Sequence, residues 1–281
     1  MRDHILTAAD LAAYQAYLEA EERAAATVTA YRRDAERFAA WLGGREATRE
    51  SLREWKEHLL SRGQAPATVN RKLAAGNCLF RFLGWEDCQV KFLRVQRRAF
   101  RDDARDLTCG EYGRLLETAR RQGRERLALL LETICSTGIR VSEVRYITAE
   151  AVEAGRAEVS LKGKVRTILL PGKLVRKLRK YIQKRKIISG AVFRAGDGTS
   201  ISRFQIWRAM KSLCAEAGVE PSKVFPHNLR HLFAVMFYRA TRDIAKLADV
   251  LGHSSLDTTR VYLRTTGAEH VRCLDRLGLV T

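Results

Sequence analysis

The chain has 281 residues, of which 46% are hydrophobic, and a formal net charge of +19. This length allows one large or two ordinary domains with real cores, and no apolar run reaches the ~18 residues of a transmembrane helix. The N-terminus leads into an alanine-rich helical pattern with acids, which argues against a signal peptide. The six cysteines form no Cys-x-x-Cys pair, so we expect reduced thiols in a cytoplasmic protein.

The positive charge is concentrated after residue 104. Residues 1–104 hold 18 Lys+Arg and 15 Asp+Glu, whereas residues 105–281 hold 33 and 17, a net charge of +16. Solubility requires much less charge than this. The sequence therefore predicts a polyanionic partner, with nucleic acid as the first candidate.

The first 93 residues predict a unit of four or five amphipathic helices. Apolar stripes at helical spacing cover residues 7–20, 27–42, about 48–63 and 66–83, and Gly43-Gly44 and Gly63 are stop signals. The start of the fourth helix is polar and basic, which suits phosphate contacts; the residues concerned are Thr68, Asn70, Arg71 and Lys72. An ordinary solvated helix start is the alternative explanation, and it stays open at this point.

Residues 94–106 are dense in charge and weakly periodic, and they include Arg97 and Arg98. We interpret them as a basic linker that lies along DNA and tethers two domains. The expected organisation is a helical DNA-binding domain over residues 1–93, the linker over 94–106, and a catalytic domain over 107–281.

The second domain is predicted to be mainly helical with one small antiparallel sheet. Thr108 and Glu111 have the spacing of a capping box, and residues 127–135 form an apolar helix broken at Thr137-Gly138. Residues 157–170 alternate as a hairpin that turns at Gly163-Lys164. A helix over residues 173–186, a candidate strand at 192–193 and a helix over 202–217 follow.

The stretch from Pro226 to Tyr262 contains the side chains best suited to act on a phosphodiester. His227 and Arg230 are three residues apart, so on a helix they share one face, at its anion-favouring N-terminal end. The apolar stripe of this helix lies elsewhere, at Leu229, Leu232, Phe233, Met236, Phe237 and Ala240. Gly252 is expected to end a short helix over residues 244–251. Ser254 or Ser255 then caps a helix that carries Tyr262 near its end.

These residues resemble the active-site signature of the tyrosine recombinases and phage-type integrases. The pattern is His-x-x-Arg-His from His227, then Leu-Gly-His with His253 placed 26 residues after His227, then Tyr262 nine residues later. The run Thr137-Gly138-Ile139-Arg140-Val141-Ser142-Glu143 also resembles a run of that family. Layout and helix count give the first domain a looser resemblance to the family's core-binding domain.

The resemblance implies a site-specific recombinase that cleaves and rejoins DNA through a 3′-phosphotyrosine, without metal, ATP or cofactor. It assigns catalytic roles to Arg140, Lys162, His227, Arg230, His253 and Tyr262, and supporting roles to Glu143 and His231. Lys162, beside the hairpin turn, is favoured over Lys164 as the general acid, although both could merely contact the DNA backbone. The further expected DNA contacts are Thr27, Tyr31, Thr68, Asn70, Arg71, Lys72, Arg97, Arg98, Lys164 and Arg166.

The expected partner is double-stranded DNA at recombination sites of a mobile element or chromosome, bound by a homotetramer in the nucleoid. No membrane partner is expected. The resemblance allows an accessory directionality factor and suggests no separate arm-binding module. The tail after Tyr262 has an amphipathic face that packs in cis or on a neighbouring protomer, formed by Ala268, Val271, Leu274, Leu277 and Leu279. The alternatives are a type IB topoisomerase-like enzyme and a catalytically silent DNA-binding protein derived from a recombinase.

Overall fold

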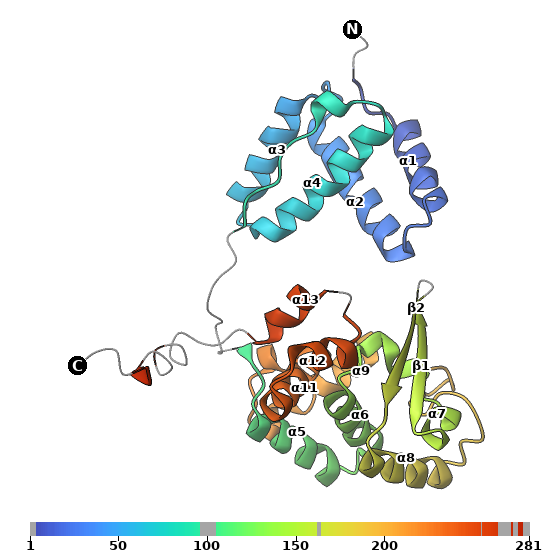
Figure 1. The fold of residues 1–281 in the computed structure, drawn as a ribbon. Helices are drawn as coiled ribbons and strands as arrows, with labels where there is room; N and C mark the ends of the chain where they lie inside the picture. The colour runs from blue at the N-terminus through green and yellow to red at the C-terminus, as the bar shows by residue number, and fades with distance from the viewer. Residues whose placement is uncertain are drawn as a thin grey trace. The chain divides into compact units, whose positions relative to one another are not determined.

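The computed structural model describes residues 4–95, 105–161, 164–253, 255–263, 271 and 275–277. The chain forms two compact units, Met1–Arg97 and Arg98–Thr281 (Figure 1). Helices dominate both units, and the strands among the described residues form a single antiparallel pair, which confirms the predicted fold class. Among these residues, no helix combines the length and apolarity needed to cross a membrane.

Within residues 4–95, the first unit contains four helices and a short 3-10 turn. These are α1 (Ala8–Ala20), α2 (Ala25–Leu42), α3 (Arg49–Ser61), α4 (Pro66–Phe82) and η1 (Glu86–Cys88). Reciprocal bonds in capping boxes begin α1 at Thr7 and α3 at Thr48, and α2 ends at Gly43 with a left-handed φ of 63°. The core is centred on Phe38, whose ring centroid lies 5.1 Å from Trp55 and 5.8 Å from Phe80.

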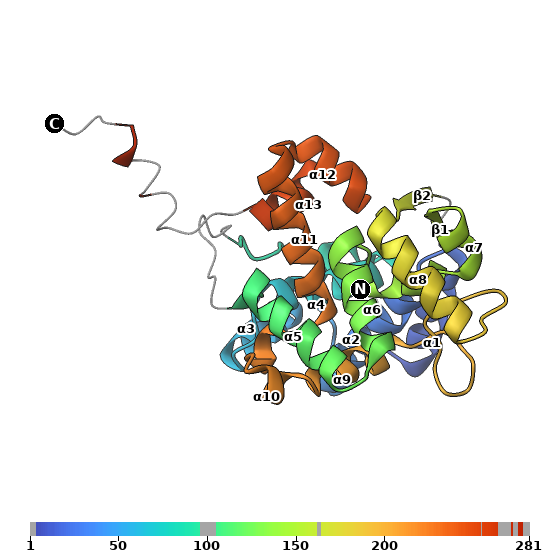
Figure 2. The same ribbon diagram turned by 90° about the horizontal axis from the view of Figure 1, so that it is seen from below.

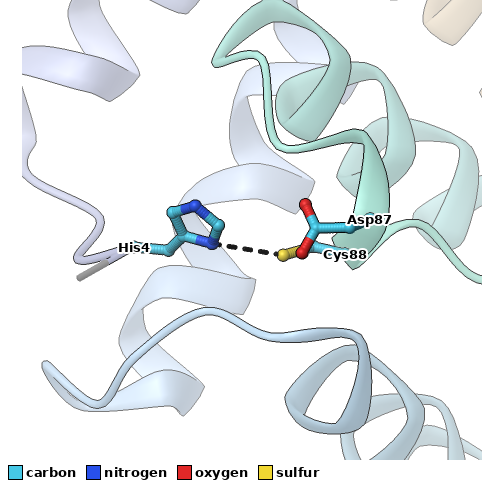
Figure 3. Close-up of side chains that lie close together, drawn as sticks. All are labelled: His4, Asp87 and Cys88. Carbon is cyan, nitrogen blue, oxygen red and sulfur yellow. Dashed lines mark hydrogen bonds between the residues drawn. The ribbon is translucent and has the colours of Figure 1, made fainter. Parts of the chain in front are cut away.

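The N-terminal segment is tied to η1 through a histidine and a cysteine (Figure 3). The His4 ring stacks on Trp85 at 4.5 Å, and its Nδ1 lies 3.4 Å from the Cys88 Sγ. The Asp87 carboxylate is close by, so that the nitrogen, sulfur and oxygen lie within 4.8 Å of one another. Burial raises the pKa of Cys88 to about 11, and its thiol donates to the Ala47 carbonyl at 3.4 Å. We interpret the group as a hydrogen-bonded tie that closes the first unit.

The second unit is built around α6. Its elements are α5 (Cys109–Arg121), α6 (Glu125–Thr137), η3 (Val141–Tyr146), α7 (Ala149–Glu153), β1 (Arg156–Leu161), β2 (Lys164–Leu169), α8 (Gly172–Lys184), α9 (Arg203–Lys211), α10 (Cys214–Ala217), η4 (Pro221–Lys223), α11 (Pro226–Thr241), α12 (Ile244–Leu251), α13 (Leu256–Arg260) and η5 (Val261–Leu263). The helix α6 packs against α5, α8 and α11, and its Leu130, Leu131 and Ile134 are almost completely buried. The hairpin and α8 lie on one side of this unit and α5 on the opposite side (Figures 1 and 2).

The hairpin pairs Leu161 with Lys164 and Val159 with Arg166. Lys164 is therefore the first residue of β2 and not part of the turn, which corrects the expected turn at Gly163-Lys164. Lys162 and Gly163 lie outside the described residues. Along the strands, Ala157, Val159 and Ile168 are at most 2% exposed, so one face of the hairpin packs on the core, as the period of two requires.

Two predicted elements of this unit differ from the structure. Val192 and Phe193 are buried, but no strand forms there, because pairing is limited to single bridges at Ala191 and Arg194. An apolar pair indicates burial without fixing backbone conformation. The predicted helix over residues 202–217 is divided into α9 and α10 at Ser212, whose hydroxyl bonds back to the Ala209 carbonyl at 2.9 Å, a contact that competes with helix continuation.

Candidate active site

Five elements of the second unit bring together the described catalytic candidates, the supporting residues Glu143 and His231, and Arg166. Helix α11 carries His227, Arg230 and His231, the residue after Gly252 at the end of α12 is His253, and η5 carries Tyr262. Tyr262 was expected near the end of the helix that begins after Ser255. It lies instead just beyond α13, in the short 3-10 helix η5. Arg140 precedes η3, which contains Glu143, and β2 supplies Arg166.

Arg230 is among the most buried large side chains of the protein, at 2% exposure. Both His227 and Arg230 lie beside Tyr262, but the expectation that this face of α11 is free is wrong for Arg230, which is buried whereas His227 is exposed. Its Nη1 donates to the Gly138 carbonyl at 2.5 Å and its Nη2 to the Leu251 carbonyl at 2.8 Å. These bonds compensate for the loss of water around a buried charge. Burial lowers the pKa of this guanidinium, and the neighbouring Tyr262 opposes that shift.

Gly138 makes the first of these contacts possible. It ends α6 with a left-handed φ of 64°, and a Cβ at this position would lie 2.3 Å from the Phe233 ring. Only glycine therefore combines the backbone conformation with the close approach of α6 to α11. The approach brings the Gly138 carbonyl within reach of Arg230.

His253 lies between Arg230 and Thr259. Its Nε2 is 2.9 Å from the Arg230 Nη2, and its Nδ1 is 2.8 Å from the Thr259 Oγ1. Because a guanidinium only donates, Nε2 accepts and the ring proton lies on Nδ1. Burial, together with Arg230, Arg140 and other nearby cations, lowers the pKa of His253 to about 4. The imidazole is therefore neutral at pH 7 in the absence of DNA.

The Tyr262 ring is surrounded by three imidazoles. Its centroid lies 5.5 Å from that of His231 and 5.7 Å from those of His227 and His253, and the His231 and His253 rings stack on it. Tyr262 is 8% exposed. His231 in turn lies 3.5 Å from the Asp106 carboxylate, so the supporting histidine is held between the phenol ring and an acid.

Arg140 pairs with Glu143 as the sequence spacing suggested. The Glu143 carboxylate accepts from the Arg140 backbone amide at 2.8 Å and from its Nη1 at 2.9 Å. The Arg140 Nη2 donates to the Gly252 carbonyl at 3.4 Å. Glu143 is 1% exposed, whereas the Arg140 side chain keeps 41% exposure. A buried acid thus orients a guanidinium that solvent, and therefore a ligand, can reach.

Arg166, an expected DNA contact, is less accessible than such a role suggests. Its side chain is 13% exposed and lies against Glu143 and α12, so its contacts in the protein without DNA are internal. The alternation of side chains along a strand could have indicated this low exposure. Arg166 is two residues before the buried Ile168 and therefore lies on the same face of β2. Thr259, fully buried beside His253, had no such signal.

The expected DNA contacts of the first unit divide into two groups. Thr68 is exposed, and Thr27 and Tyr31 are partly exposed. The others lie against the protein itself. The Asn70 amide bonds to both backbone groups of Leu93, and Arg71 pairs with the buried Asp34. Lys72 is buried, at 6% exposure. Desolvation lowers the pKa of Lys72, and Asp34 opposes this effect. Arg97 and Arg98 lie outside the described residues, as does Lys162.

Both units of the chain match models of known protein families. The phage integrase family matches residues 105–269, and the phage integrase N-terminal SAM-like domain matches residues 11–87. The tyrosine recombinase XerC of Roseiflexus castenholzii is 32% identical over 86% of this chain and 85% of its own length. The tyrosine recombinase XerA of Pyrococcus furiosus is 28% identical over 100% of this chain and 98% of its own.

Solved structures share the fold. A XerH site-specific recombinase bound to its difH substrate superposes with a TM-score of 0.69 at 18% identity, over 97% of this chain and 90% of that one. A lambda integrase dimer bound to a core site gives 0.73 at 17% identity, over 92% and 78%. The matched family spans most of the chain, so this protein belongs to the phage integrase family of tyrosine recombinases, enzymes that cleave and rejoin DNA.

Proposed function

We propose that this protein recombines DNA at specific sites, with Tyr262 as the nucleophile. The observation that carries the proposal is the position of Tyr262, whose ring packs against His227 and His253 beside the buried Arg230. A phenol is a weak nucleophile until a neighbouring acceptor takes its proton. Neither alternative from the sequence is favoured by a particular contact in the site.

Each side chain then has one task. The Tyr262 oxygen bonds to phosphorus as the bond to the deoxyribose 5′-oxygen breaks, and His227 takes the phenolic proton. Arg140 and Arg230 bind the non-bridging oxygens, where charge develops in the transition state. His253 lies next to Arg230 to contact the same oxygens, although its Nε2 accepts from Arg230 before DNA binds. Donation from Nε2 to a phosphate thus requires that His253 gain a second proton, or that its proton move from Nδ1 to Nε2 while the Thr259 hydroxyl donates to Nδ1.

The product of this step is a 3′-phosphotyrosyl link and a free 5′-hydroxyl. Because the link keeps a phosphoester bond, the reverse attack by a 5′-hydroxyl rejoins a strand without ATP. A nicked suicide site, from which the short cleaved strand diffuses away, should therefore accumulate a covalent protein–DNA adduct in excess EDTA. Loss of the adduct when divalent metal is removed would contradict the mechanism.

Lys162 is proposed to give the proton to the leaving 5′-oxygen. Lys162→Ala should slow single-turnover cleavage by roughly 10²–10⁴-fold, the usual contribution of a general acid. DNA with a bridging 5′-sulfur should restore the rate, since a thiolate leaves without a proton. Lys164→Ala is the matched control and should cleave both substrates normally. If the sulfur substrate rescued the Lys164 variant instead, the general acid would be Lys164.

The assembly is proposed to be a homotetramer on paired DNA sites, in which the tail of each protomer docks on the next. Of the amphipathic tail residues, Val271 and Leu277 belong to the described part and are exposed in the isolated chain, at 54% and 59%. Deletion of residues 268–281 should leave one protomer bound to one half-site and abolish the paired complex in a gel-shift assay. Synapsis that survives the deletion would mean that the tail packs on its own domain.

A further inference from the structure

Arg166 joins three elements that carry the proposed active site. It lies on β2 opposite Val159, and its guanidinium contacts Glu143 of η3 and the last turn of α12. At 13% exposure the side chain is largely removed from solvent. A cation buried in this way must find partners in the protein, and its partners are neighbours of Arg140 and His253.

The first partner is shared with Arg140. Glu143 accepts from the Arg166 Nη1 at 3.2 Å on Oε1 and 3.1 Å on Oε2, and from the Arg140 Nη1 at 2.9 Å on Oε1. One buried carboxylate therefore lies between two guanidiniums. The Arg140 backbone amide also donates to Oε2 at 2.8 Å, so Arg140 and Arg166 fix the carboxylate together, and removal of Arg166 takes away its contacts from the hairpin side.

The second partner is the backbone at the end of α12. The Arg166 Nη2 donates to the Val250 carbonyl at 2.6 Å. Its aliphatic stem packs directly under Gly252, where an added Cβ would lie 2.3 Å from the Arg166 Cδ. The Gly252 carbonyl accepts from Arg140 at 3.4 Å, and the next residue is His253. Both of the acceptors that the structure gives Arg140, Glu143 and Gly252, are thus held by Arg166.

We propose that Arg166 is a positioning residue for strand cleavage: it fixes the Arg140 guanidinium through Glu143 and the turn of Gly252 and His253 through α12. The inference rests on the proposed function, since cleavage is its readout. It differs from the role in DNA binding expected from the sequence, because the contacts of Arg166 are internal. Misplacement of a reacting group by about 1 Å can cost about 10²-fold in rate.

The test compares Arg166→Gln with Arg156→Gln, a control on the partner strand whose side chain is 61% exposed and meets only Glu158, at 4.0 Å, in the described structure. Half-site affinity, the single-turnover rate of adduct formation and the melting temperature are measured for each. We expect Arg166→Gln to bind DNA within about 3-fold of the wild type and to cleave about 10²-fold more slowly at temperatures where it is folded. Arg156→Gln should cleave normally.

Two further variants separate positioning from charge and from folding. Arg166→Lys keeps a cation beside Glu143 but cannot reach the Val250 carbonyl at the same time, so it should remain at least about 10-fold slow, and it supplies the measurement if Arg166→Gln does not fold. In a Glu143→Gln background, Arg166→Gln should cost much less than it does alone, because the route through Glu143 is already broken.

Three results would overturn the inference while leaving the proposed function intact: normal cleavage by Arg166→Gln, weaker DNA binding with a normal cleavage rate, or strictly additive effects of the Arg166 and Glu143 changes. The absence of any adduct with the wild type and with Arg156→Gln would instead contradict the proposed function, and this inference would fall with it.

Discussion

Tyr262→Phe should form no covalent adduct on a nicked suicide site, while it binds the same DNA about as tightly as the wild type. The substitution removes only the phenolic oxygen. The ring keeps its packing against His227, His231 and His253, so the protein should fold normally, with about 1 kcal/mol lost at most. Loss of one hydroxyl should likewise change affinity for a large polar interface by less than about tenfold.

The measurement is denaturing electrophoresis of labelled DNA after incubation with protein, together with a gel shift for binding. Tyr238 lies on α11 and packs with the same small cluster as Tyr262, so Tyr238→Phe is a matched control that should still form the adduct. An adduct that persists with Tyr262→Phe, or one that disappears only with Tyr238→Phe, would assign the nucleophile to another residue.

Arg230→Lys should slow cleavage by roughly 10²–10³-fold, which is what removal of one fixed donor to a developing charge costs in other enzymes. The guanidinium reaches the Gly138 and Leu251 carbonyls and His253 with two nitrogens. A lysine has one nitrogen and cannot reproduce this planar arrangement, although it keeps the charge. DNA affinity should fall much less than the cleavage rate.

Arg239→Lys, on an exposed position of the same helix, is the control and should cleave normally. The melting temperature must be measured as well, because Arg230→Lys leaves a buried carbonyl without its donor. A folded Arg230→Lys protein that cleaves within about 3-fold of the wild type would remove Arg230 from the proposed transition-state contacts.

Local patterns predicted much of the fold. The reciprocal bonds of Thr108 with Glu111 and the left-handed Gly252 occur as expected, since both depend on residues near in sequence. The arrangement of the site was harder to predict from local patterns. The spacing of His227 and Arg230 correctly placed both on one helix, but burial of Arg230 depends on carbonyls 92 and 21 residues away in the chain.

Arg166 and Lys72 illustrate the same limit. A charged residue in a hairpin or at a helix start is normally solvated, so the sequence suggested DNA contacts for both. Lys72 is instead buried and Arg166 largely covered, each near an acid, Asp34 or Glu143, that lies far away in the sequence. Patterns of polarity report on local preference, and they do not identify which distant carboxylate will compensate a buried cation.

The carbonyls bound by Arg230 belong to the ends of two helices, since Gly138 follows the last residue of α6 and Leu251 is the last residue of α12. Aligned peptide dipoles give such ends a partial negative charge of about half an elementary charge each. Together the two ends supply about one elementary charge, but this charge is spread along two helices and takes up no proton, so it stabilises the guanidinium without placing a carboxylate beside an incoming phosphodiester. The position of Arg230 is therefore supported by the backbone itself, and it persists as long as both helices keep their final turns.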